Sequence, residues 1–174
     1  MRTLERLLFS FIVASPLLAS EARVRVPDVQ LTDQNGKVVR VQSGLMKGHT
    51  VAINFIFTSC TTICSPMGAT FGKVQSLVDP KQVRLISISI DPDTDTPERM
   101  HRWGARFKAG PSWTLLTGPR EDVDKLRKAF GLYTPDRFAH SPTVVIANAA
   151  GEWTRVNGIG NANGIADAIK AITK

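Results

Sequence analysis

The chain has 174 residues, of which 43% are hydrophobic and 21% charged, and its formal net charge at pH 7 is +7. This length suits one domain that can bury a proper core without a disulfide, and the composition is ordinary for a soluble globular protein. The basic residues are scattered, and the densest stretch, residues 120–128, also carries three acidic side chains. The lack of a basic stripe argues against a nucleic-acid partner and favours an acidic partner or an anionic membrane surface.

The N-terminus has the pattern of a secretory signal. Arg2 and Arg6 precede an uncharged, mostly apolar run at residues 7–19, which small residues follow. That run is shorter than the roughly 20 residues a membrane-spanning helix needs. A cleaved signal at residues 1–22 is favoured, with an uncleaved N-terminal anchor as the alternative. We therefore expect an exported domain at residues 23–174, either periplasmic or anchored to a membrane and facing the periplasm, where a cysteine pair has redox meaning.

The first part of this domain predicts a hairpin, a buried strand and a helix. Apolar residues alternate with polar ones on both sides of Asn35-Gly36, which predicts a β-hairpin. Residues 51–57 are nearly all apolar and of strand length, as in a central strand covered on both faces. The next apolar stripe predicts a helix that begins near Met67 and ends at Asp79-Pro80.

Strands and helices continue to alternate to the end of the chain. Strands are expected at 83–90, 113–116, 143–148 and 152–156, and helices around 100–107, 123–130 and 165–172. This order predicts an α/β fold with a mixed central sheet and helices on both of its faces. Functional residues of open α/β sheets collect at the carboxyl ends of the strands, which directs attention to the loops after residues 57 and 90.

The only two cysteines of the chain, Cys60 and Cys64, lie in the first of these loops. A thiol at a helix N-terminus has a lowered pKa, and its thiolate attacks disulfides and binds metals. The alternatives are a structural disulfide or two buried thiols. A disulfide that closes so short a loop removes little chain entropy. The polar neighbours Ser59, Thr61 and Thr62 argue against a place in the core.

One of the three histidines, His140, lies just before a predicted core strand, at the rim expected to hold the cysteines. His49 in a turn and His101 on a helix are interpreted as surface residues. Two thiolates and one imidazole form a soft ligand set that suits copper, since structural zinc sites have four ligands and thiolates select Cu(I). Met67 could add a fourth ligand, but it also fits the apolar stripe of its helix. The Ser-Pro bond at Pro142 could be cis or trans.

The acidic stretch at residues 91–98, DPDTDTPE, follows the second core strand. It lacks the glycine and the bidentate glutamate that an EF-hand calcium loop requires. A helix start explains it better, in one of two ways. Asp95 and Glu98 form a capping box, or Thr96 caps the helix with Pro97 at its first position.

Taken together, these motifs resemble the Sco/SenC family of thioredoxin-like copper chaperones for cytochrome c oxidase assembly. The resemblance rests on Phe57 with Cys60 and Cys64 after an apolar strand, on DPDTDTPE after the next strand, and on His140 before a late strand. It covers about residues 23–174. It implies a thioredoxin-like fold, copper held by both cysteines and His140, and delivery to the copper-bearing subunit of the oxidase. It also implies export, often with membrane association through the N-terminus.

The same cysteine pair supports a second hypothesis, an exported thiol–disulfide oxidoreductase. One cysteine would attack a disulfide of another exported thiol protein, the other would resolve it, and Cys60 and Cys64 would be the catalytic pair with a redox-active disulfide. His140 would then only tune the thiols. A peroxidase is disfavoured because Phe57 stands where peroxide-reducing relatives have threonine. Whether the protein is an enzyme stays open at this point.

Overall fold

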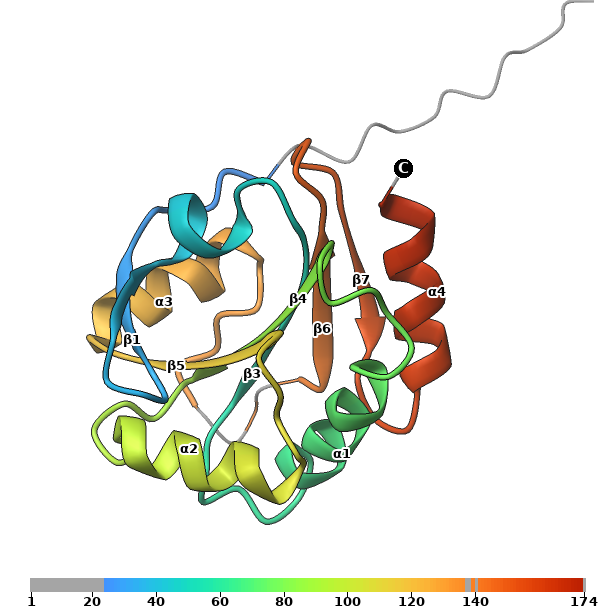
Figure 1. The fold of residues 1–174 in the computed structure, drawn as a ribbon. Helices are drawn as coiled ribbons and strands as arrows, with labels where there is room; N and C mark the ends of the chain where they lie inside the picture. The colour runs from blue at the N-terminus through green and yellow to red at the C-terminus, as the bar shows by residue number, and fades with distance from the viewer. Residues whose placement is uncertain (1–23, 137–138, 140, 174) are drawn as a thin grey trace, which may run out of the picture.

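The computed structural model describes residues 24–136, 139 and 141–173. This part of the chain forms one mixed sheet of seven strands in the order β2-β1-β5-β4-β3-β6-β7 (Figure 1). The central strands β3, β4 and β5 are parallel, while β1, β2, β6 and β7 pair antiparallel with their neighbours. The strands are β1 Gln30–Asp33, β2 Val38–Arg40, β3 Thr50–Ile56, β4 Val83–Ser89, β5 Trp113–Thr117, β6 Thr143–Ala147 and β7 Trp153–Asn157. The predicted mixed sheet is confirmed.

The predicted N-terminal hairpin is formed by β1 and β2, with Leu31 opposite Val39. Its turn includes Gly36 with φ +81, a left-handed backbone that glycine adopts without strain. The Asp33 side chain accepts the backbone N–H of Asn35 at 2.8 Å and holds the turn. The hairpin joins the sheet through β1, which pairs with β5.

Four α-helices follow the predicted stripes: α1 Cys64–Val74, α2 Pro97–Arg106, α3 Arg120–Ala129 and α4 Ala162–Ile172. The π-helical turn η1, Val41–Met46, was not predicted. α1 ends at Val74, earlier than the expected stop at Asp79-Pro80. Beyond this end the chain continues in tighter turns, with the N–H of Leu77 donating to the carbonyl of Val74. The Gln75 amide there donates to the carbonyl of Lys108 and accepts the N–H of Gly110.

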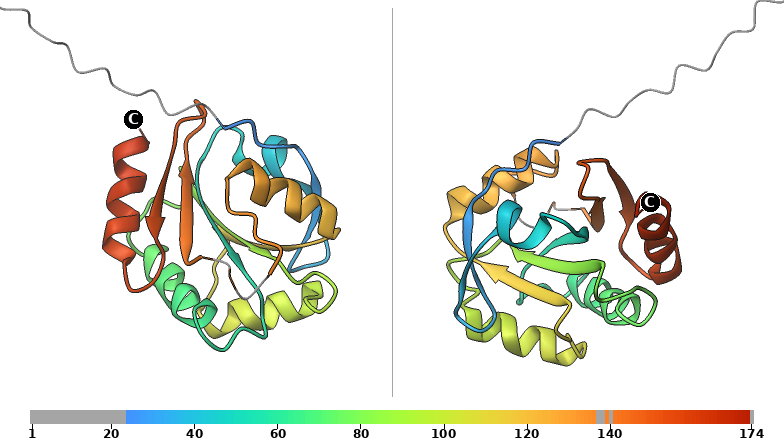
Figure 2. Two further views of the ribbon diagram at one scale, coloured as in Figure 1. Left: turned by 180° about the vertical axis from the view of Figure 1, so that it is seen from behind. Right: turned by 45° about the horizontal axis from the view of Figure 1, so that its top comes forward.

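Helices cover both faces of the sheet (Figure 2). Phe71 of α1 and Trp103 of α2 both contact the buried Trp113 of β5, with ring centroids 5.5 and 6.2 Å apart, so α1 and α2 share one face. α4 packs beside α1 on the same face. α3 lies on the other face, where Phe130 at its C-terminus contacts Phe55 of β3.

One rim of this sheet gathers three loops. The loop after β3 and the loop after β4 meet there because the two strands are parallel. β6 runs antiparallel to β3, with Val144 opposite Asn54, so the chain begins β6 beside the point where β3 ends. The cysteine loop, the acidic loop and the segment that leads into β6 are therefore neighbours, as the sequence predicted for this rim.

Candidate functional site

The cysteine loop joins β3 to α1 and brings the two cysteines together. Cys64 is the first residue of α1, and Ile63 before it caps the helix with no side-chain hydrogen bond. The backbone N–H of Cys64 instead donates to Sγ of Cys60 at 3.4 Å. The Cys60 sulfur thus lies at the positive end of the α1 dipole, where a thiolate is stabilised. Both cysteines are thiols, with no disulfide between them.

The two thiols have opposite pKa shifts. Burial raises the pKa of Cys60, but hydrogen bonds from the Cys64 thiol and from Thr62 outweigh it and lower the pKa from 9.0 to about 7. The pKa of Cys64 is raised, first by burial, then by its hydrogen bond to Cys60 and by the negative charges of Cys60 and Asp95. The arrangement therefore places a thiolate on Cys60 and a proton on Cys64 near neutral pH.

Both cysteines are buried, which corrects the expectation drawn from their polar neighbours. Cys60 is 7% exposed and Cys64 is fully buried, whereas Ser59, Thr61 and Thr62 are exposed. The loop buries its sulfur atoms while Ser59, Thr61 and Thr62 stay exposed, and the Thr62 hydroxyl reaches back to Sγ of Cys60 at 3.5 Å. The sulfur pair is thus shielded from water, which strengthens the hydrogen bond between the two groups.

The structure separates two of the three histidines from the cysteines. His49 directly precedes β3, so it lies at the end of the strands opposite to the cysteines. Its Nδ1 is 3.0 Å from the carbonyl of Lys47. His101 is exposed on α2. His140 lies outside the described residues, so its position as a metal ligand stays a prediction. Within residues 24–136, 139 and 141–173, no three His, Cys, Asp or Glu side chains gather closely enough to hold a metal ion.

The chain just after His140 is fixed at the rim. Gly158 donates its N–H to the carbonyl of Pro142 at 2.7 Å, and the hydroxyls of Ser141 and Thr143 are 2.6 Å apart. No peptide bond among the described residues is cis, so the bond before Pro142 is trans. Met67 is fully buried, and its methyl group lies close to the backbone of Gly158. Met67 is accordingly a core residue, as its helical stripe indicated.

The acidic loop begins α2 through Thr96 and not through a capping box. The hydroxyl of Thr96 accepts the N–H of Arg99 at 3.3 Å, and Pro97 is the first residue of the helix. Of the two alternatives, the threonine cap is therefore confirmed and the pairing of Asp95 with Glu98 is wrong. Glu98 instead forms an ion pair with Arg102 on the surface of the helix.

Asp95 has a different position, which the sequence did not reveal. Its side chain is fully buried. The carboxylate accepts the backbone N–H of Thr58 at 3.0 Å, the hydroxyl of Thr58, and the hydroxyl of Ser89 at 2.6 Å. Asp95 thus ties the cysteine loop to the end of β4. In the sequence, Thr58 and Ser89 follow or end the two core strands and Asp95 lies shortly after. This pattern is too common in proteins to predict the contact.

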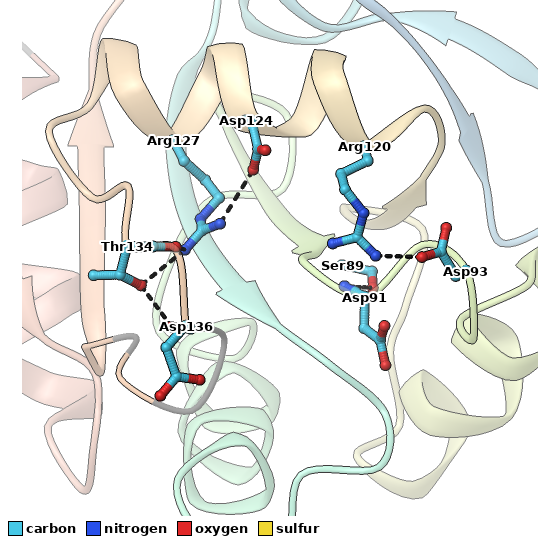
Figure 3. Close-up of polar contacts among 8 residues, drawn as sticks. All are labelled: Ser89, Asp91, Asp93, Arg120, Asp124, Arg127, Thr134 and Asp136. Carbon is cyan, nitrogen blue, oxygen red and sulfur yellow. Dashed lines mark hydrogen bonds and ion pairs between the residues drawn. The ribbon is translucent and has the colours of Figure 1, made fainter.

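Two arginines of α3 extend the support of this rim (Figure 3). Arg120 forms an ion pair with Asp93 of the acidic loop. Arg127, whose side chain is 6% exposed, binds Asp124 at 3.2 Å and donates to the carbonyl and the hydroxyl of Thr134 at 3.0 and 3.1 Å. The segment that leads toward His140 is therefore held against α3.

Solved structures with this fold include several Sco proteins. A SCO1/SenC family lipoprotein from Bacillus anthracis is 28% identical, with a TM-score of 0.75 over 87% of this chain and 96% of that one. BsSco, a member of the Sco family of cytochrome c oxidase assembly proteins with a disulfide switch, is 26% identical, with a TM-score of 0.74 over 87% and 94%. Bradyrhizobium japonicum ScoI with copper bound is 26% identical, with a TM-score of 0.67 over 82% and 95%.

These likenesses show the thioredoxin-like fold, and copper is bound in the Bradyrhizobium protein. The chain spans about half of the length of the curated relatives it matches. Among the described residues, no helix combines the length and the apolar character needed to cross a bilayer. The SCO1/SenC family model matches residues 19–174, nearly the entire chain. On this match and these structures, the chain belongs to the SCO1/SenC family.

Proposed function

We propose that this protein carries copper on Cys60, Cys64 and His140 and delivers it to a copper site of a respiratory oxidase during assembly. The observation that carries the proposal is the convergence of the two cysteines, with the N–H of Cys64 3.4 Å from Sγ of Cys60 at the sheet rim. Two thiolates at one point are the soft donors that select Cu(I). Copper is the cargo here and leaves by exchange of these ligands for those of the acceptor.

The acid–base properties of the pair suit a reversible metal site. Metal binding requires deprotonated thiols, and the pKa of about 7 supplies a thiolate on Cys60 at neutral pH. Cys64 releases its proton when the metal binds, because its raised pKa keeps it protonated before. His140 would complete the set from the segment before β6, whose first residues are fixed by the hydrogen bond between Gly158 and Pro142.

We also propose that residues 1–22 direct export, as a cleaved signal or as a membrane anchor, and that residues 23–174 form the exported domain. The support is the charged start and apolar run of the sequence, together with the lipoprotein nature of the Bacillus anthracis relative. N-terminal sequencing of the protein isolated from its source membrane and soluble fractions distinguishes the cleaved from the anchored form.

Copper stoichiometry on protein reduced and loaded without oxygen tests the proposal. We expect one Cu(I) per chain, abolished by Cys60→Ser or Cys64→Ser because a single thiolate remains. His140→Ala should release copper to a competing chelator at a lower chelator concentration. His49→Ala is the matched control, since His49 lies at the other end of β3 from the cysteines. A reduced wild-type protein that binds no copper would contradict the proposal.

The pKa asymmetry of the pair favours thiol–disulfide exchange as the second candidate function. Cys60 has the lowered pKa of an attacking thiol, and Cys64 is placed to resolve the mixed disulfide. The same His140→Ala variant separates the two functions. A copper carrier loses copper retention, whereas an oxidoreductase keeps most of its rate of reduction of a model disulfide.

A further inference from the structure

A row of three arginines lies beside the cysteine loop on α2. Arg99, Arg102 and Arg106 recur at helical spacing and therefore share one face. Together with Thr58 and Trp103 they line an open hollow of about 350 Å³. Thr58 belongs to the cysteine loop, two residues before Cys60. The chain between β3 and α1 runs next to α2 in both figures (Figures 1 and 2). The cysteine loop thus forms part of the wall of the hollow through Thr58.

This hollow is positively charged. Residues 97–108 carry four cationic residues and one acidic residue, Glu98. Glu98 pairs with Arg102 at the surface. Arg99 lies 4.0 Å from a carboxylate oxygen of Asp95, but that carboxylate is buried and already binds Thr58 and Ser89. Arg106 lies over the ring of Phe107 and forms no ion pair among the described residues. Within its own bounds α2 thus carries three arginines and one glutamate.

The position of the hollow favours a protein partner over a membrane. Val24 lines a pocket with Lys47, Ala147 and Asn148, next to the start of β3 and the end of β6. The described chain thus begins at the opposite end of the molecule from α2 and the cysteine loop (Figure 1). A chain held at a membrane by its N-terminus would turn this hollow away from the lipid. Complementary charge across an interface steers the encounter of two proteins and fixes their register. A partner that brings its sulfur atoms to Cys60 requires such a fixed register.

We propose that the arginine hollow docks an acidic segment of the protein that exchanges ligands or disulfides with Cys60 and Cys64. The proposal deepens the proposed function, because it names the chemistry of the partner at the same site. Acidic side chains next to the partner's cysteines would lie over Arg99, Arg102 and Arg106 while those cysteines reach the sulfur pair.

Thiol–disulfide exchange with synthetic peptides tests this docking without copper. Two peptides of equal length carry one cysteine as a disulfide with thiopyridine, flanked by Asp and Glu in one and by Asn and Gln in the other. The Cys60 thiolate attacks the peptide sulfur and releases thiopyridine. Cys64 then attacks Cys60 and releases the peptide thiol. The protein loses two electrons to become the Cys60–Cys64 disulfide, the probe gains them, and thiopyridine absorbance gives the rate.

We expect the acidic peptide to react about tenfold faster than the neutral one at low salt, and the advantage to shrink at high ionic strength. In the triple variant Arg99→Gln, Arg102→Gln and Arg106→Gln, the ratio of the two rates should fall toward one. The ratio cancels any change in the thiolate population, since both peptides react with the same thiol. The matched control replaces three exposed lysines away from the rim, Lys47, Lys81 and Lys170, by Gln, and should keep the ratio.

Equal rates for the two peptides, or an equal loss of the ratio in the lysine control, would overturn the docking proposal. Vesicles of phosphatidylglycerol give the other decisive result. Loss of vesicle binding in the arginine variant, with no preference between the peptides, would assign the hollow to lipid and also overturn it. If the reduced protein binds no copper but still reacts faster with the acidic peptide, the proposal that copper is the cargo is contradicted and the docking proposal stands.

Discussion

Cys60 and Cys64 are close in sequence and in space, yet their environments separate them chemically. Cys60 accepts hydrogen bonds that stabilise its thiolate, and its pKa is about 7. Cys64 is fully buried, and its pKa is raised by burial and by the charge on Cys60. One proton shared unequally between two sulfurs gives an attacking thiolate and a resolving thiol. The same pair provides a first and a second ligand for a soft metal.

The pH dependence of alkylation tests this asymmetry. A lowered thiol pKa means that the thiolate prevails above about pH 7 and is lost as the pH falls below it. The rate of modification of Cys60 by iodoacetamide should therefore be half-maximal near pH 7, and mass spectrometry should find Cys60 modified before Cys64. A half-maximal rate near the ordinary thiol pKa of 9.0, or modification of Cys64 first, would contradict the assignment.

Asp95 shows how one buried side chain positions the cysteine loop. Replacing Asp95 with Ala leaves the N–H and hydroxyl of Thr58 and the hydroxyl of Ser89 without their acceptor. We expect the free energy of unfolding to fall by about 2–3 kcal/mol, measured by urea denaturation at pH 7. Asp167→Ala is the control. Asp167 is 76% exposed, and its loss should cost less than about 0.5 kcal/mol. Equal effects of the two substitutions would show that Asp95 is not structural.

At the scale of the elements, α3 supports two of the three loops at the rim from the far face of the sheet. Arg120 near its start holds Asp93 of the acidic loop, and Arg127 near its end holds Thr134 (Figure 3). The ring of Tyr133 stacks on Arg127 as well, with the guanidinium 5.1 Å from the ring centre. A helix that contributes no predicted ligand thus fixes the approach of the chain to His140.

Arg127→Met tests this support. The substitution keeps the apolar stem but removes the hydrogen bonds to Thr134 and the ion pair with Asp124. We expect the free energy of unfolding to drop by about 2 kcal/mol, and the Cu(I) form to lose its metal to a chelator faster. Exchange of the copper-free form with the neutral peptide disulfide should be unchanged, since the sulfur pair lies on another loop.

The control for this test is Lys125→Met on the same helix. Lys125 is half exposed and pairs with Asp122 at the surface, so both stability and copper release should stay near the wild-type values. Copper release that is the same in the Arg127 and Lys125 variants would show that the segment before His140 does not depend on α3.

For the whole molecule, the alternation of strands and helices and the rim that gathers their loops followed from apolar periodicity. The hairpin followed from Asn35-Gly36, and the cysteine pair was found because the chain has no other cysteine. These signals are local, and periodicity records which face of an element is buried.

Contacts between distant segments left no such signal. Asp95 and Thr58 are 37 residues apart and meet only through the sheet. Arg127 is buried where a cation on a helix is expected to face water. The burial of both sulfurs was also missed, because the polar residues beside Cys60 are exposed and made an exposed pair the expected one. The third ligand was predicted from its place before β6 and from the family resemblance, not from any local pattern around His140.

X-ray absorption at the copper edge of the Cu(I)-loaded protein tests the central claim most directly. We predict two sulfur scatterers and one imidazole nitrogen per copper in the wild type. The imidazole contribution should vanish in His140→Ala and persist in His49→Ala. A spectrum that His140→Ala leaves unchanged, or one without two sulfur neighbours, would contradict the assignment of Cys60, Cys64 and His140 as the copper site.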